Sequence, residues 1–167
     1  MIIKLSNFDD GVHRLVFDEP VTAVGLSEPF KGNVHLEVKM DKSHSQIVLN
    51  GTLKVEAIFV CDRCNEEYTT DLINDFQVTF LFDKQPKEAE VLNLYYISPE
   101  TDKINITNDV IDFAQLAIPM KRLCSEDCKG LCPRCGANLN TDVCRCKQED
   151  TDSIWAPLLK LKKNINN

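Results

Sequence analysis

The sequence predicts an α+β fold, in which a mainly antiparallel β-sheet meander is covered by one helix and followed by a cysteine-rich segment and a C-terminal helix. Three observations predict it. Apolar and polar residues alternate in several runs between residues 33 and 82, one run after residue 107 has helical spacing, and eight cysteines fall in four close pairs. With 167 residues, 43% of them hydrophobic, the chain has enough apolar mass for a core.

The alternating runs predict the strands. Short mixed runs in residues 2–24 predict strands near the start, and Gly25 to Gly32, with Pro29 between them, predicts a loop. The alternation is strong from Asn33 to Met40, resumes at Ile47, and continues after Gly51. A last run places four apolar side chains on one face: Phe76, Val78, Phe80 and Phe82. Four sequential strands with short links predict an antiparallel meander with one face in water.

One helix is expected from about Asp109 to Ile118. Thr107 or Asn108 is the expected N-cap, and Pro119 ends the helix or lies just past it. Its apolar stripe should cover the sheet and consists of Val110, Ile111, Phe113, Ala114, Ala117 and Ile118. Residues 83–90 predict a polar loop, and residues 91–97 and 104–106 predict short extended segments. A last helix is expected within residues 154–165, docked by Trp155.

Charge is unevenly distributed. Residues 1–102 hold 9 basic and 18 acidic residues, whereas residues 103–167 hold 10 and 8. This balance argues against a general nucleic-acid binder and leaves one contact surface in the C-terminal third. No apolar run reaches the roughly 18 residues of a membrane helix, and the opening residues lack the features of a signal peptide. We therefore expect a cytoplasmic protein.

The cysteine pairs favour metal binding. Eight cysteines could also form a disulfide framework, but no export signal precedes them. Pairs spaced CxxC or CxC aim two thiolates at one point, as a tetrahedral metal requires. The residues from Lys121 to Lys147 have almost no hydrophobic period, so burial alone cannot order them. Metal is the expected source of order.

The clearest site is a zinc knuckle in the C-terminal third. Cys132 and Cys135 flank a sharp turn, after which Gly136 tolerates the positive φ that such turns need. Cys144 and Cys146 lie at i, i+2 spacing, which places both sulfurs on one face. Because loop closure is cheapest within a short segment, we expect these four cysteines to share one ion.

The second site then combines Cys61 and Cys64 with Cys124 and Cys128. The first pair lies at a hairpin tip, and the second must reach back to it and so staple the C-terminal segment to the sheet. A different pairing, with Cys61 and Cys64 beside Cys144 and Cys146, is the alternative. A thioredoxin-like redox role for the first pair is disfavoured, because that motif opens a helix in a βαβ unit.

Both expected sites are structural zinc sites. Four thiolates leave no open position for water, whereas a catalytic zinc keeps one. The chain also has no GxSxG, Walker, GxGxxG or HExxH motif, so we expect no enzyme. The expected organisation is residues 1–118 as the sheet domain with its covering helix, 119–150 as the zinc-binding segment and 151–167 as a docking helix or tail.

Several stretches closely resemble the YceD family of large ribosomal RNA subunit accumulation proteins. They are residues 124–140, Cys144-Arg145-Cys146, Cys61-Asp62-Arg63-Cys64, Leu116-Ala117-Ile118-Pro119 and residues 152–161. The resemblance covers most of residues 33–161, although the tail departs from the usual Asp-Pro-Arg. It implies a cytoplasmic bacterial protein needed for accumulation or processing of large-subunit ribosomal RNA, without known catalytic activity.

The expected function is therefore a non-enzymatic ribosome-biogenesis factor that supports accumulation or processing of 23S ribosomal RNA. Its partners would be the large-subunit RNA precursor, a ribosomal protein or a ribonuclease, with no small-molecule substrate. An RNA or partner contact is expected at the basic residues of the C-terminal third: Lys121, Arg122, Lys129, Arg134 and Arg145, extended by Lys160, Lys162 and Lys163. The alternatives are a zinc-stapled protein adaptor and a thiol redox or zinc-responsive regulator.

Overall fold

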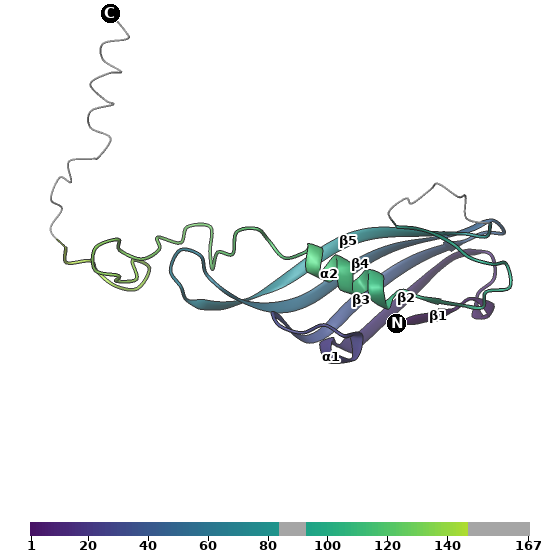
Figure 1. Cartoon of the computed structure of the whole chain (residues 1–167), viewed down its shortest axis with the longest axis horizontal. Coiled ribbons are helices and arrows are strands. Elements are labelled where there is room, and N and C mark those ends of the chain that lie inside the picture. The colour runs from purple at the N-terminus through teal and green to yellow at the C-terminus, as the bar shows by residue number, and fades with distance from the viewer. Residues whose placement is uncertain (84–92, 147–167) are drawn as a thin grey trace, which may run out of the picture. The chain divides into compact units, whose positions relative to one another are not determined.

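A five-stranded sheet with the order β2-β3-β4-β5-β6 dominates the structure, and a two-stranded sheet pairs β1 with β7. The structure, a computed structural model, describes residues 1–83 and 93–146. It divides into two units, Met1–Cys128 and Lys129–Asn167, of which the first carries both sheets (Figure 1). The predicted tail helix, Lys160, Lys162, Lys163 and most of the polar loop after residue 83 lie outside the described residues.

The predicted antiparallel meander is confirmed. β2 (Gly11–Pro20), β3 (Phe30–Lys42), β4 (Gln46–Val60) and β5 (Glu67–Leu81) pair in sequence order, each antiparallel to the next. β6 (Leu94–Tyr96) instead pairs parallel to the end of β5. β1 (Ile2–Lys4) and β7 (Lys103–Asn105) pair across about a hundred residues of chain, which local patterns do not predict.

One face of the large sheet carries the core. The alternating apolar residues of β3, β4 and β5 are buried there, and β1, β7 and the helices contribute to the same cluster. α1 (Val21–Val24) contacts β2 and β3, while α2 (Thr107–Leu116) contacts β4 and β5. Figure 1 shows α2 lying across the sheet. The other face, here called the open face, carries the polar residues of the same alternation.

The helix expected to cover the sheet is present, but its predicted start and cap are wrong. α2 begins at Thr107, and its N-cap is Ile106, which makes no side-chain cap hydrogen bond. The Thr107 N–H instead donates to the side-chain oxygen of Asn105, at 3.0 Å. Of the predicted stripe, Val110 and Ala114 are fully buried and the remaining residues pack against the core.

Gly51 does not interrupt its strand. The alternating runs on either side of it form a single strand, β4, in which Gly51 pairs with Phe76 of β5. A Cβ atom on Gly51 would lie 2.5 Å from Cζ of Phe76. The Phe76 ring is itself held by stacking on Phe113, with the ring centroids 4.4 Å apart. Glycine is therefore required here by a close side-chain approach rather than by a turn.

Gly51→Ala is expected to destabilise the sheet unit by about 1–3 kcal/mol, the usual cost of overpacking a filled core. The measurement is the free energy of unfolding in a denaturant titration. Gly51→Ala combined with Phe76→Leu is the matched control, since the smaller side chain makes room for the methyl group. An unchanged free energy of unfolding in the single variant would show that the Phe76 ring moves aside at no cost.

Within the described residues, none of the helices combines the length and the apolar composition that crossing a membrane requires.

Candidate metal centres

The structure brings the eight cysteines together as two groups of four. One group joins Cys61, Cys64, Cys124 and Cys128, and the other joins Cys132, Cys135, Cys144 and Cys146. Within each group all four Sγ atoms lie within 4.8 Å of one another. These are the two sets expected from the spacing, and each set lies within one of the two units.

The sulfur separations suit a metal rather than a disulfide. The distance is 3.8 Å from Cys61 to Cys128 and 3.6 Å from Cys64 to Cys124. In the second group, Cys144 lies 3.3 Å from Cys132 and 3.8 Å from Cys135. Tetrahedral zinc with Zn–S bonds of about 2.3 Å separates its sulfurs by about 3.8 Å, whereas a disulfide bond is about 2.05 Å long. None of the eight cysteines forms a disulfide bond.

Both CxxC pairs form the same turn. In the first, the Cys61 N–H donates to the Glu66 carbonyl and the Asn65 N–H donates to the Cys61 carbonyl, each at 2.9 Å. In the second, Cys132 donates to Ala137 at 2.8 Å and Gly136 donates to Cys132 at 2.9 Å. The turn thus repeats bond for bond at residues 61–66 and 132–137.

A left-handed residue follows each CxxC pair. Gly136 has a φ of 72°, as the sequence predicted, and Asn65 takes the same place in the first turn with a φ of 60°. Sequence reasoning missed the role of Asn65. The available signal was its identity, because asparagine enters this region more readily than other residues with a side chain.

Backbone N–H groups converge on the first cysteine of each knuckle. Burial raises the pKa of Cys61, but N–H donation from Cys124, Cys64 and Arg63 outweighs it and lowers that pKa to about 6. The neighbouring sulfurs of Cys128 and Cys64 raise the pKa of Cys124 to about 12. The Cys61 thiolate is thus stabilised by the backbone, whereas that of Cys124 is opposed by the neighbouring sulfurs.

The second group follows the same logic. N–H donation from Cys135 and Arg134 lowers the pKa of Cys132 to about 6. The sulfurs of Cys135 and Cys144 raise the pKa of Cys146 to about 12. A bound divalent cation would remove this mutual repulsion, since it attracts every thiolate in the set.

The two central residues of the first CxxC clamp the returning segment. Asp62 exchanges two hydrogen bonds with the Arg122 backbone, one through its N–H and one through its carboxylate, each at 2.8 Å. Nη1 of Arg63 donates to the carbonyl oxygens of Glu126 and Cys128, at 3.2 and 2.9 Å. These bonds hold residues 122–128 at the hairpin tip, where Cys124 and Cys128 complete the first group.

The second group orders a segment with little core of its own. Among residues 129–146, Cys132 is the only residue with a buried side chain, while Leu131 and Val143 are 41% and 87% exposed. Backbone contacts exist, such as the isolated bridge between Leu131 and Asn138. They do not supply the apolar burial that normally stabilises a fold. The four thiols are the feature that can supply order.

The five basic residues of the predicted contact surface that the structure describes are exposed. Lys121 and Arg122 belong to the first unit, and Lys129, Arg134 and Arg145 belong to the second. The Arg122 guanidinium lies 3.7 Å from Asp62 and so adds an ion pair to the contacts that Asp62 makes with the Arg122 backbone. Their role as a contact surface stays a prediction.

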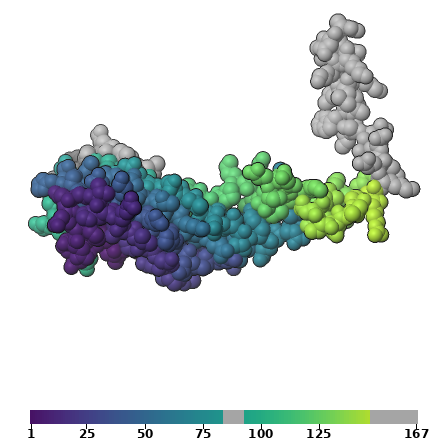
Figure 2. All heavy atoms as spheres, turned by 180° about the vertical axis from the view of Figure 1, so that it is seen from behind, coloured from purple at the N-terminus to yellow at the C-terminus, as the bar shows by residue number. Residues whose placement is uncertain are grey.

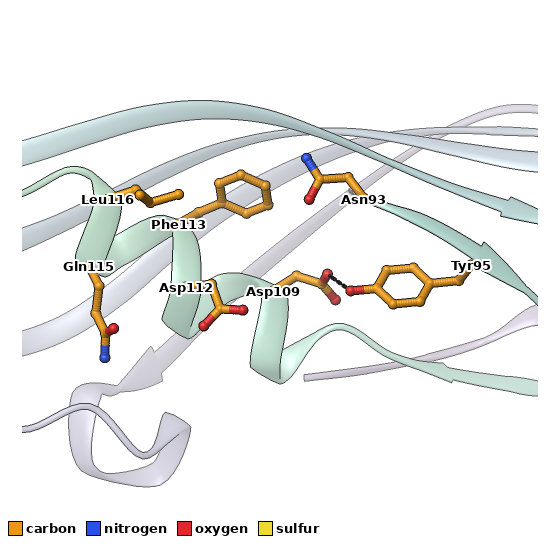
Figure 3. A pocket seen from close by; sticks show the side chains of 7 residues that line it. All are labelled: Asn93, Tyr95, Asp109, Asp112, Phe113, Gln115 and Leu116. Atoms are coloured by element: carbon orange, nitrogen blue, oxygen red, sulfur yellow. Dashed lines mark hydrogen bonds between the residues drawn. The ribbon is translucent and has the colours of Figure 1, made fainter. Parts of the chain in front are cut away.

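A pocket of about 460 Å³ beside α2, away from the cysteines, is a candidate active site to be weighed (Figure 3). The Tyr95 hydroxyl donates to Oδ1 of the buried Asp109 at 2.6 Å. This hydrogen bond raises the pKa of Tyr95 to about 12. The two polar groups are thus paired with each other, and their bond ties β6 to α2 rather than forming an acid–base pair aimed at a substrate.

Comparison with known proteins places these sites in a family. The model of the family described as large ribosomal RNA subunit accumulation protein YceD matches residues 49–162, a span that contains all eight cysteines. No solved structure matches the chain.

Curated relatives agree with this match. An Arabidopsis thaliana protein named large ribosomal RNA subunit accumulation protein YCED homolog 1, chloroplastic, is 24% identical over 159 residues, which cover 79% of this chain and 49% of that protein. Its Zea mays namesake is 24% identical, over 72% and 51% of the two chains. An uncharacterized Mycobacterium tuberculosis protein is also 24% identical, over 75% and 60%. The chain spans about half the length of the two plant relatives. It belongs to the YceD family of large ribosomal RNA subunit accumulation proteins.

Proposed function

We propose that this chain is a non-enzymatic factor that supports accumulation or processing of large-subunit (23S) ribosomal RNA in the cytoplasm, with two structural zinc ions. The observation that carries the proposal is the family match, which spans both cysteine groups. The family description concerns RNA accumulation and specifies no reaction.

Zinc is proposed because of the donor set. Each group offers four thiols at separations suited to a tetrahedral ion, and soft thiolates select zinc over magnesium or calcium. Four protein ligands close the coordination sphere, so the ion would hold structure and leave no position for a reacting water. In the first unit it would fix residues 122–128 to the sheet hairpin, and in the second it would order residues 129–146.

Arg63→Ala is expected to weaken zinc binding at the first group about 10-fold to 100-fold, the usual effect of losing a residue that orients metal ligands. The reason is the loss of both bonds from Arg63 to the carbonyls of Glu126 and Cys128. Competition against a chromophoric chelator measures the affinity.

Arg122→Ala is the matched control for that experiment. It removes an arginine from the same clamp but keeps the backbone bonds to Asp62, and it loses only an exposed ion pair at 3.7 Å. Equal zinc affinities in the Arg63 and Arg122 variants would contradict the proposed role of Arg63.

The proposed contact with RNA uses the exposed basic residues near the two zinc sites: Lys121, Arg122, Lys129, Arg134 and Arg145. Within each unit, a rigid backbone would present these side chains in a fixed pattern. Binding through so few charges should be weak and should fall steeply with salt concentration. The partner would be a precursor of the large-subunit RNA.

The test is a charge reversal at Arg134 and Arg145 together, with zinc content verified as unchanged. Cells that depend on the variant should accumulate less large-subunit RNA, and RNA crosslinking to the protein should drop. Lys4→Glu with Lys54→Glu makes the same change in net charge on exposed residues of β1 and β4, and should leave both readouts intact.

Normal accumulation and normal crosslinking in the Arg134 and Arg145 variant would remove these residues as the contact. Crosslinking to a ribonuclease or a ribosomal protein, with no RNA, would favour the adaptor function instead.

A further inference from the structure

The open face of the sheet carries a straight row of hydrogen-bond donors. Arg14 of β2 pairs in register with Lys39 of β3, Lys39 pairs with Asn50 of β4, and Asn50 pairs with Gln77 of β5. All four side chains are exposed. We call this set the donor row. It crosses four strands spaced about 4.8 Å apart and so spans about 14 Å. The strands form the surface seen from behind in Figure 2.

Two cations lie directly opposite each other in this row, which is unfavourable for the sheet itself. Like charges on facing residues of neighbouring strands destabilise their pairing. The other two lysines of the open face avoid this arrangement: Lys31 lies 3.5 Å from Glu56, and Lys54 lies 2.8 Å from Asp71. Neither Arg14 nor Lys39 forms an ion pair with any described residue. The pair is therefore not explained by stability of the fold.

The pair has the chemistry of a phosphate contact. Facing residues in an antiparallel pair have Cα atoms about 4.5–5.5 Å apart, so both cationic groups can reach one phosphate. The arginine fork matches two phosphate oxygens, while lysine adds a point charge. Both cations line a hollow of about 330 Å³ that Asn50 also lines. The amides of Asn50 and Gln77 continue the donors along the row.

Acidic neighbours limit what can bind. Glu37 also lines the hollow, and Asp41 and Asp75 lie one row to either side of the donor row. These carboxylates would repel a wide polyanion such as duplex RNA, but a single strand running along the row itself would meet two cations and two amides. No Phe, Tyr or Trp occupies the open face of β2 to β5, so the bases would find no stacking platform.

We propose that the donor row binds the sugar–phosphate backbone of one single strand of RNA, with one phosphate held between Arg14 and Lys39. This surface rests on the proposed function in ribosomal RNA accumulation and adds a contact on the sheet to the basic residues of the C-terminal third. Recognition is of backbone rather than base, so sequence preference should be weak. The net negative charge of residues 1–102 gave no indication that two cations, Arg14 and Lys39, face each other on this sheet.

The experiment compares Arg14→Gln/Lys39→Gln with Lys31→Gln/Lys54→Gln in the full chain, using a short fluorescent oligouridine as probe. Both double variants lose the same charge from the same face. The first should bind the probe about 10-fold more weakly at low salt, and the slope of log K against log salt should shrink by about 0.7, the contribution of one phosphate on a single strand. The second should keep the slope of the unaltered protein. Melting temperatures check that both remain folded, and Arg14→Gln alone should give an intermediate loss.

Equal loss in the two double variants would overturn the inference, because it would reflect net charge alone. Retained binding in the Arg14 and Lys39 variant would also overturn it, yet would leave the proposed function standing through the C-terminal basic residues. Displacement of the probe by polyglutamate as readily as by unlabelled oligouridine would replace the RNA contact with a general anion site. No binding of the probe by the unaltered protein would overturn the inference and count against direct RNA contact in the proposed function.

Discussion

Cys64→Ser is expected to reduce the zinc content from two ions per chain to one and to release residues 122–128 from the hairpin tip. Cys64 is 3% exposed, and its sulfur lies 3.6 Å from that of Cys124. Removing one of the four thiolates leaves the ion with an incomplete set of protein ligands. Structural zinc sites bind their ion with an apparent free energy of about 10–16 kcal/mol, so the loss should be large. Amide exchange should become fast in residues 122–128, while the ladder between β3 and β4 stays protected.

Ser125→Ala is the matched control, since it alters the same segment without removing a proposed ligand. It should keep two zinc ions and slow exchange. If Cys64→Ser also kept two ions and full protection of residues 122–128, the first site would not exist as proposed. A simultaneous loss of both ions would show that the two sites depend on each other.

Cys135→Ser is expected to unfold residues 129–146 and leave the sheet unit folded. Cys132 is the only residue of that segment with a buried side chain, so little remains to order it without metal. For this segment alone, backbone amide hydrogens should exchange fast with solvent, and the amide signals in nitrogen-15 NMR should lose their chemical-shift dispersion. The free energy of unfolding of the sheet unit should stay unchanged.

Leu131→Ala is the control for this variant. Leu131 is 41% exposed, so shortening it removes apolar contact of the second unit without removing a thiol. It should leave the segment ordered. Global unfolding of Cys135→Ser, or equal disorder in the two variants, would contradict the claim that metal orders this unit independently of the sheet.

The strands were predictable because the sheet buries one face only. Val34, Leu36, Val38 and Met40 are at most 2% exposed and alternate with polar residues, so the two-residue period is visible in the sequence. The continuity of β4 through Gly51 was not predictable, since its cause is a ring 25 positions away along the chain. The pairing of β1 with β7 was not predictable either, because strands of three residues carry too little pattern to indicate a distant partner.

The membership of the two cysteine groups was predictable because four of the cysteines lie close together in the sequence. Cys132 to Cys146 span a short loop, and the first group then follows from the remaining four cysteines. The clamp formed by Asp62 and Arg63 was not predictable, because it depends on how residues 122–128 return to the hairpin. The donor row was hidden for a related reason: Arg14, Lys39, Asn50 and Gln77 meet only through the strand register.

Metal content per chain tests the central claim most directly. The protein purified under reducing conditions should contain two zinc ions per chain by elemental analysis, and its intact mass in native spectrometry should show eight thiols and no disulfide. Removal of the ions with a strong chelator should disorder residues 129–146 and free residues 122–128, and added zinc should restore both. A preparation that contains no metal and four disulfides, or that keeps both segments ordered after the chelator has removed every ion, would contradict the account.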